Sequence, residues 1–548
     1  MHHRVWPKQP GFVADTTASL IRTARHTTTG AGVNTYRLAN EPRRNAGSRP
    51  GRPALTSGSR TRTYGELDER TSRLAQALLA SGVRAGSRVA VLDRSSIEVI
   101  EVLLAAAKVG AITVPLNWRL DVAELLVVVE DAEPAVLIAH QEFRASADVV
   151  YARVPSLRAV VVIGDPTLED DYETFLSAGD PVDPGFEGDV DEVVLQLYTS
   201  GTTGAPKGVL TTNRNLGACT SAGGPWGFDD SSVSLGAMPM FHIAGLGWAL
   251  VGLANGAHTV IVRELLPSVV LDLLESERIT NVFLVPTVIG MLIELPGAAD
   301  RDYTALRSIA YGSSPITPAL LRRAVKTFGR PLFQLYGLTE THGAITQLDA
   351  TDHDPGGPRE YLLSSAGRPY PWVELRIASL DDPARTAEVD EPGEIWIRSP
   401  QNTPGYFHRP DETAALIDGQ GWLHSGDVGR VDADGYLFIS DRLKDMIITG
   451  GENVYPIEVE AVLSEHPEVA GVAVIGLPDP RWGEAVSAVV VRTPGATVTP
   501  DALITYTRGR LAGYKTPKHV EFVAALPVGP TGKILKRQLR DEKREQYS

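Results

Sequence analysis

The sequence predicts an α/β fold: a large N-terminal domain of helix-covered, mostly parallel sheets with a small antiparallel β subdomain, followed by a small α+β C-terminal domain. Three observations lead to this prediction. Short apolar runs alternate with helical patterns over the first two thirds of the chain, as in a parallel sheet. From about Ser365 polar and apolar residues alternate, as in an antiparallel sheet. Near Asp441 a polar, glycine-marked segment interrupts the pattern, and we expect a domain boundary there.

The first half of the chain alternates helices and strands. Thr63 and Glu66 stand at capping-box spacing, and Leu67, Leu74 and Leu78 then recur on one helical face. The alternation continues with strands expected at 88–93, 111–116 and 134–140 and helices at 95–110 and 121–132.

The later elements follow the same patterns. Parallel strands are expected at 233–240, 258–262 and 281–286, and antiparallel strands at 373–377, 393–399 and 434–441. The compact C-terminal set comprises helices at 457–469 and 501–511 and strands at 470–477, 484–493 and 519–526.

The N-terminal segment and the most apolar stretch of the chain help to define the expected domains. Residues 1–34 are basic and poorly patterned, without an apolar core of signal-peptide length, so we expect a disordered extension. The glycine-rich stretch 243–262 contains Asn255 and His258, which favours a buried helix and strand over a membrane span. The domains are therefore expected at 35–440 and 441–548.

Composition excludes several classes of partner. The chain of 548 residues has a formal charge of −15, from 52 Lys and Arg against 67 Asp and Glu, which argues against nucleic acid. Cys219 is the single cysteine, so neither an internal disulfide nor a cysteine zinc site can form. We expect it to be a small core or loop residue rather than a nucleophile, in a cytoplasmic protein. Peripheral membrane contact stays open, as does the choice between monomer and homodimer.

The segment YTSGTTGAPKG at 198–208 has the composition of a phosphate-holding loop. Its hydroxyls can donate, its glycines let backbone N–H groups approach an anion, and Lys207 adds positive charge. Pro206 and Gly208 replace the second glycine and the Ser or Thr of the usual P-loop, which disfavours a nucleotide kinase. On composition alone a solvated turn explains the segment equally well.

Six further motifs follow this loop in a fixed order: MPMFHIAG, YGLTET, GEIWIRSP, WLHSGDVG, DRLKDMIITGGENVYPIEVE and PTGKILKRQLR. With this ordered set the chain resembles the acyl-adenylate-forming superfamily, which includes acyl-CoA synthetases, peptide-synthetase adenylation domains and beetle luciferases. The resemblance covers nearly everything after the N-terminal tail. It implies that 35–440 is an AMP-binding domain and that 441–548 is a mobile lid.

The resemblance also implies a nucleotide site. A clamp over the pyrophosphate half of ATP is implied at Thr199, Ser200, Gly201, Thr202, Thr203, Gly204 and Lys207. The adenine side is implied at Gly312, Ser313, Ser314, Tyr336 and Gly337, where the two serines depart from the usual family pattern.

Four residues are implied to hold the rest of the nucleotide. Thr339 is assigned to phosphate contact and Glu340 to Mg²⁺, which prefers oxygen ligands. The Asp427 carboxylate can accept two hydrogen bonds from a ribose diol, and Arg442 would donate to the same ribose. An ordinary surface ion pair between Asp427 and Arg442 is the alternative.

The remaining motif residues concern the acid, the lid and the thiol. His242 is similar to the residue at the mouth of the carboxylate pocket, although a lone histidine in an apolar stretch is more often a core residue. Lys533 would stabilise charge that develops on the α-phosphate oxygens, and Lys444 stands at the hinge position. Gly450 and Gly451 are expected to leave space for pantetheine.

These parts imply an ATP-dependent acid–thiol ligase with ATP, Mg²⁺ and coenzyme A as cofactors. A carboxylate, already ionised near neutral pH, would attack the α-phosphate to give acyl-AMP and pyrophosphate, and the CoA thiol would then take the acyl group. A fatty acid is the first expectation. An aryl or hydroxycinnamate-type acid, a carrier-protein thiol as acceptor, a luciferase-type oxygenase and a non-catalytic adenylate-binding protein are the alternatives.

Overall fold

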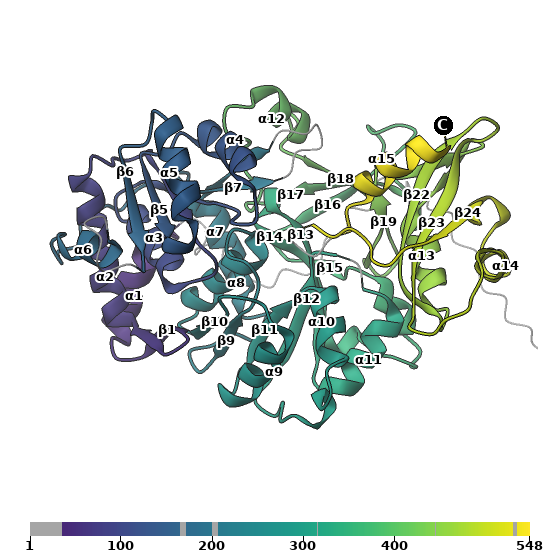
Figure 1. Ribbon diagram of the computed structural model, residues 1–548, viewed down its shortest axis with the longest axis horizontal. Helices are drawn as coiled ribbons and strands as arrows, with labels where there is room; N and C mark the ends of the chain where they lie inside the picture. The colour runs from purple at the N-terminus through teal and green to yellow at the C-terminus, as the bar shows by residue number, and fades with distance from the viewer. Residues whose placement is uncertain are drawn as a thin grey trace, which may run out of the picture.

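The computed structural model describes residues 35–164, 171–199, 206–314, 316–443, 445–529 and 534–547. Two large sheets and a small antiparallel sheet form most of the molecule, and the last elements of the chain gather at one end, coloured yellow-green in Figure 1. This arrangement confirms the predicted α/β fold with its antiparallel subdomain.

The first sheet has six strands in the order β6-β5-β3-β4-β7-β8, all parallel except the edge strand β8. Helices α4 and α5 pack on one face, while α2 and α3 pack on the other. Coverage of both faces explains why its strands are continuous apolar runs. The strands are β3 (Arg88–Leu92), β4 (Ile112–Pro115), β5 (Val136–His140), β6 (Ala159–Ile163), β7 (Val193–Thr199) and β8 (Lys207–Thr212), and the helices are α2 (Tyr64–Ala80), α3 (Ile97–Ala107), α4 (Val122–Ala132), α5 (Arg144–Arg153), α6 (Tyr172–Ser177) and α7 (Asn213–Thr220).

The second sheet has nine strands in the order β15-β14-β13-β12-β11-β9-β10-β1-β2, with a parallel centre and antiparallel edges. Its strands are β1 (Pro53–Ser57), β2 (Arg60–Thr63), β9 (Val233–Gly236), β10 (His258–Ile261), β11 (Asn281–Leu284), β12 (Ser308–Gly312), β13 (Leu332–Leu338), β14 (Gly343–Leu348) and β15 (Arg368–Pro369). The associated helices are α1 (Asn40–Ser48), α8 (Ile243–Ala254), α9 (Pro267–Ser276), α10 (Pro286–Ile293) and α11 (Pro318–Phe328). No helix among the described residues is both long enough and apolar enough to cross a membrane.

Two sequence details are confirmed here. Thr63 and Glu66 form the capping box that begins α2. The stretch 243–262 forms the buried helix α8 followed by β10, as expected.

The antiparallel subdomain is a four-stranded sheet in the order β16-β17-β18-β19. It consists of β16 (Glu374–Ser379), β17 (Gly393–Arg398), β18 (Leu423–Val431) and β19 (Leu437–Arg442), with α12 (Pro410–Leu416) alongside. Because β19 ends at Arg442, the last strand of this sheet leads directly into the C-terminal elements.

The C-terminal elements form a separate five-stranded sheet with helices on both faces. Its strands are β20 (Ile447–Thr449), β21 (Glu452–Val454), β22 (Val469–Asp479), β23 (Gly483–Arg492) and β24 (His519–Phe522), and its helices are α13 (Pro456–Ser464), α14 (Pro500–Arg508) and α15 (Lys536–Tyr547). One apolar cluster joins α13 and α14 to the sheet, and another joins α15 through Leu539. The α+β composition is as predicted, whereas the exact domain boundaries stay a prediction.

Candidate active site

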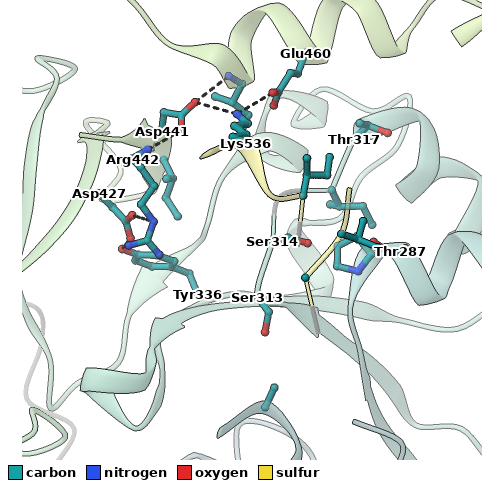
Figure 2. A pocket seen from close by; sticks show the side chains of 18 of the residues that line it. Thr287, Ser313, Ser314, Thr317, Tyr336, Asp427, Asp441, Arg442, Glu460 and Lys536 are labelled. Atoms are coloured by element: carbon teal, nitrogen blue, oxygen red, sulfur yellow. Dashed lines mark hydrogen bonds and ion pairs between the residues drawn. The ribbon is translucent and has the colours of Figure 1, made fainter. Parts of the chain in front are cut away.

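A continuous cleft of about 3070 Å³ runs between the large sheets, the antiparallel subdomain and the C-terminal elements. Its walls include residues of β7, β13, β18 and β19 and the serines that follow β12, together with residues of α13 and α15. Figure 2 shows Tyr336 and Asp427 on one side of this space and Ser313 and Ser314 on the other. The cleft therefore brings most of the described candidate residues to one place.

Asp427, Tyr336 and Arg442 form a connected corner of the cleft. Asp427 is 3% exposed; its Oδ2 accepts a 2.6 Å hydrogen bond from the Tyr336 hydroxyl, and its Oδ1 lies 2.8 Å from Arg442 Nε. Strand register explains the ion pair, since Asp427 on β18 is the direct partner of Arg442 on β19. A buried, doubly contacted carboxylate differs from a loose surface pair. All three residues line the cleft, which fits the expected role in holding a ribose.

Burial and charge set the protonation of this corner. Burial raises the pKa of the Tyr336 hydroxyl well above its ordinary value, and the charge of Asp427 adds to the effect. Burial has the largest single effect on the Arg442 guanidinium and would lower its pKa, but the combined negative charges around it, first among them Asp427, raise the pKa above its ordinary value. The corner thus presents a neutral phenol and a charged pair at neutral pH.

A second cluster joins Glu340, Tyr406 and Lys207. The Tyr406 hydroxyl donates to Glu340 Oε1 at 2.9 Å, and Lys207 Nζ lies 5.1 Å from the centre of the Tyr406 ring. Thr339 begins the short 3-10 turn that carries Glu340, and both line the cleft. Tyr406 thus contacts both a carboxylate, which suits Mg²⁺, and an ammonium group, which suits a polyphosphate.

The predicted phosphate loop is a connection between paired strands. Thr199 at the end of β7 and Lys207 at the start of β8 are direct partners in the antiparallel register, and both line the cleft. The connecting candidates lie outside the described residues: Ser200, Gly201, Thr202, Thr203 and Gly204. The strand pairing nevertheless fixes both ends of the loop at the cleft.

The adenine-side candidates gather where strands approach closely. A Cβ on Gly337 would lie 1.8 Å from the Gly343 carbonyl oxygen, and one on Gly312 would lie 2.2 Å from that of Leu335. Neither position therefore accepts a side chain without backbone movement. Ser313 adopts φ +67°, a left-handed conformation uncommon for serine, and it lines the cleft with Ser314.

The apolar branch of the cleft has aromatic walls. Trp226 stacks on Trp248 with ring centres 5.3 Å apart, and Trp248 meets Phe228 edge-on at 5.0 Å. Cys219 is buried in this region, as expected, and burial raises the pKa of its thiol to about 12, so it is not a nucleophile at neutral pH. His242 precedes α8, packs edge-on against the Phe241 ring and lines the cleft.

Some predicted residues are not brought to the cleft or lie outside the described residues. Gly450 and Gly451 occupy the turn between β20 and β21 and are not among the residues that line the cleft. A Cβ on Gly450 would meet the Trp482 ring at 2.8 Å, so the tryptophan already fills the space beside this glycine. Lys444 and Lys533 lie outside the described residues, but both neighbours of the 530–533 segment, Gly529 and Ile534, line the cleft.

Sequence reasoning missed a buried polar group behind Glu340. His342 is fully buried. Its Nε2 is hydrogen-bonded to the Thr211 hydroxyl, and its Nδ1 lies 3.1 Å from the Gln401 carbonyl oxygen. Gln401 Nε2 in turn donates to the Thr341 and Ala344 carbonyls. Burial lowers the pKa of His342 to about 4, so its ring is neutral at physiological pH. The group joins segments far apart in the chain, and only the His342 that follows the YGLTET motif could have hinted at it.

Another cluster contains side chains of the kind that bind metal ions, but an arginine is paired with its carboxylates. Ligand atoms of Asp93, His140 and Glu142 lie within 4.8 Å of one another. Arg263 pairs with both carboxylates, at 2.9 Å for Asp93 Oδ1. The arginine supplies the positive charge there, and we assign the cluster a structural role.

Comparison with known proteins agrees with this geometry. Family models described as AMP-binding enzyme and AMP-binding enzyme C-terminal domain match residues 42–407 and 458–533. Fatty acid–[acyl-carrier-protein] ligase ScoC of Streptomyces coeruleorubidus is 38% identical over 90% of this chain and 93% of its own length. A feruloyl-CoA synthase of an Amycolatopsis species is 39% identical over 92% of this chain and 98% of its own.

A solved structure gives the same result. ATP-bound MatB of Rhodopseudomonas palustris superimposes with a TM-score of 0.85 and 30% sequence identity, over 93% of this chain and all of the other (100%). Both family models match this chain, and its relatives align over nine tenths of it. The cleft also contains residues expected to bind a nucleotide. The chain belongs to the AMP-binding enzymes of the acyl-adenylate-forming superfamily and is an AMP-forming acid ligase.

Proposed function

We propose that this enzyme activates a carboxylic acid as acyl-AMP and passes the acyl group to the thiol of CoA, with Mg²⁺ bound to the nucleotide. The supporting observation is that one cleft contains the Asp427 corner, the Glu340–Tyr406–Lys207 cluster and an apolar branch. ATP bound by the first two groups would present its α-phosphate toward an acid held in the third. A reaction at phosphorus then needs positioning and charge neutralisation rather than a general base.

The residues divide into two sets of roles. Asp427 and Arg442 would hold the ribose, and Tyr336 would bound the adenine space. Glu340 would hold Mg²⁺, and Lys207 would face the outer phosphates. When bound, Mg²⁺ would neutralise phosphate charge.

The apolar branch supports an acid with an uncharged tail. Cys219, Trp226, Trp248 and Ala344 line it, and burial keeps the one thiol neutral. A fatty acid stays the first candidate, in line with the Streptomyces relative. The stacked Trp226 and Trp248 favour a second candidate, a flat aromatic acid, because aromatic rings pack well against one another.

The acceptor is the second open choice. The two relatives described above are named for different acceptors, a carrier protein and CoA. We propose CoA, with pantetheine approaching beside Gly450 and Gly451 after a rotation of the C-terminal elements about Lys444. In the described orientation Trp482 lies against Gly450, the space beside Gly451 is open, and neither glycine lines the cleft, so the proposed thiol step would need the rotation to bring this turn to the acyl group.

A panel of acids tests this proposal. AMP release should require an acid and ATP, and free CoA should increase it with formation of an acyl-CoA, without any carrier protein. Hexanoate to palmitate, benzoate and hydroxycinnamates would distinguish the two acid classes. Release of ADP in place of AMP would contradict the proposal, and thioester formation only on a carrier protein would overturn the choice of CoA.

A further inference from the structure

Lys536 links the C-terminal elements to the antiparallel subdomain. Its Nζ lies 2.8 Å from Glu460 Oε1 and 3.8 Å from Asp441 Oδ2, a three-residue contact visible in Figure 2. The side chains are largely buried, with exposures of 17% for Lys536, 9% for Asp441 and 19% for Glu460. Ion pairs with this little exposure are screened less by solvent than surface pairs.

The two carboxylates belong to different structural units. Asp441 lies on β19, the last strand of the antiparallel subdomain. Glu460 lies on α13, and both α13 and α15 pack on the five-stranded C-terminal sheet. The contact between Lys536 and Glu460 is therefore internal to the C-terminal elements, whereas that between Lys536 and Asp441 crosses from one sheet to the other.

Asp441 is fixed on the subdomain side and also touches α13. Its Oδ1 accepts from the Arg442 N–H at 2.7 Å, and its Oδ2 accepts from the Ile457 N–H at 3.2 Å. Since Lys444 follows three residues later, any rotation at that position would separate Asp441 from both Lys536 and Ile457. Glu460, which also accepts from the Val474 N–H at 2.7 Å, would keep its contact with Lys536.

The contact stands next to the segment that carries Lys533. Val528 and Ile534 pair as an antiparallel bridge, and Leu535 N–H donates to the Pro527 carbonyl at 2.9 Å. Lys536 begins α15 directly after this bridge. Lys536 thus lies directly beside the two described ends of the segment, which this bridge joins to each other at the cleft.

We propose that Lys536 is a positioning residue for the adenylation half-reaction: by bridging Asp441 and Glu460 it holds the C-terminal elements in the orientation that brings Gly529 and Ile534 to the cleft. The proposal rests on the adenylate chemistry proposed above. The bridge is not part of the reacting centre; it stabilises one of two domain orientations, and it opens when the C-terminal elements rotate for the thiol step.

The electrostatics of the bridge depend on pH. Burial raises the pKa of Asp441 to about 6, although Lys536 and the Arg442 N–H act in the opposite sense. The charged groups that act on Asp441 are Lys536 from α15, Glu460 from α13 and Asp445 from the segment that follows β19. Asp441 gains its charge as pH rises through about 6, so the bridge is strongest at neutral and alkaline pH.

Asp441→Asn tests the bridge because it removes one charge and keeps the shape of the side chain. At pH 7.5 we expect ATP–pyrophosphate exchange to fall about tenfold, whereas acyl transfer from supplied acyl-AMP to CoA stays within about twofold of wild type. The wild-type to variant ratio for exchange should shrink toward one below pH 5, where Asp441 is protonated in wild type as well. Lys536→Arg keeps the charge and should retain most of the exchange activity.

Arg540→Gln is the matched control on the same helix. Arg540 Nη2 lies 3.0 Å from Asp445 Oδ1, so this pair joins α15 to a residue beyond Lys444 and does not cross to β19. Its loss should change exchange by less than about twofold. An Asp441→Asn variant with wild-type exchange, an equal loss of both half-reactions, or an exchange ratio independent of pH would each overturn the positioning role. Wild-type protein without exchange for any acid would instead contradict the proposed function.

Discussion

The nucleotide side of the cleft and its C-terminal side differ in how their side chains are held. Asp427 and Arg442 are register partners on neighbouring strands of one sheet, so backbone hydrogen bonds fix their separation. Lys536, at the start of α15, and Asp441, on β19, belong to different structural units and meet only through side chains. We propose that the first side is a rigid wall that serves both half-reactions, and that the second is a side that separates from it and serves only one.

The largest loss of activity is expected from a change in the C-terminal elements, the side that separates. Lys533→Ala should lower ATP–pyrophosphate exchange by about 10²–10³-fold, because a positive charge at the α-phosphate acts mainly in the transition state. Exchange of labelled pyrophosphate into ATP measures this directly, and Arg537→Gln, on the adjoining exposed helix face, serves as a control for general loss of positive charge. Exchange within twofold of wild type for Lys533→Ala would remove this residue from the adenylation step.

A change in the rigid wall should act on nucleotide binding. Asp427→Ala removes the acceptor for Tyr336 and the partner of Arg442, and we expect ATP affinity to fall about 30-fold. Isothermal titration with a non-hydrolysable ATP analogue measures the affinity. Because ribose is present in both half-reactions, acyl-AMP affinity should fall as well; unchanged affinity for both nucleotides would contradict the ribose assignment.

A smaller effect is expected at the carboxylate next to the phosphate loop. Glu340→Gln should raise the Mg²⁺ concentration needed for half-maximal exchange by about tenfold, since a neutral amide is a weaker ligand for Mg²⁺. Tyr406→Phe removes only the hydroxyl that donates to Glu340 and should cause a smaller change. If Glu340→Gln showed the same Mg²⁺ dependence as wild type, Glu340 would not be a Mg²⁺ ligand.

The smallest functional effect is expected from His342, which supports the wall from behind. Burial holds its folded-state pKa near 4. Above pH 6.5 the ring is neutral in both folded and unfolded chains, so it contributes no pH dependence. As pH falls from about 6.5 to 4 the unfolded chain binds a proton that the folded chain excludes, so the free energy of unfolding falls by about 3 kcal/mol at most.

Urea unfolding at pH 7.5 and 5.0 measures this effect. His342→Asn suits the comparison because asparagine tolerates the left-handed backbone at this position, where φ is +54°. The variant should lose part of the pH dependence while ATP affinity at pH 7.5 stays near wild type. An unaltered pH dependence would show that other groups cause the acid loss.

Local sequence patterns predicted most of the fold. The Thr63 capping box, the strand at 88–93 and the helix–strand pair at 243–262 all depend on short-range spacing, and the structure confirms them. The pairing of β1 with β10, distant in the chain, depends on tertiary packing and could not be read from periodicity.

The candidate site divides in the same way. Asp427, Glu340 and Lys207 lie in motifs and are brought to one cleft. Tyr406 and Lys536 were missed because their partners come from other segments of the chain. The roles of the site residues, the cytoplasmic location and the oligomeric state stay predictions.

On this proposal the Asp427 side of the cleft serves both half-reactions, whereas the C-terminal side with Lys533 serves only adenylation. The most direct test is the thiol half-reaction of Lys533→Ala. Purified variant would be supplied with acyl-AMP and CoA, and acyl-CoA formation would be followed in a single turnover. We predict a rate within about threefold of wild type, despite the loss of pyrophosphate exchange, because the wall still holds the adenylate. A loss of thiol transfer as large as the loss of exchange would contradict it.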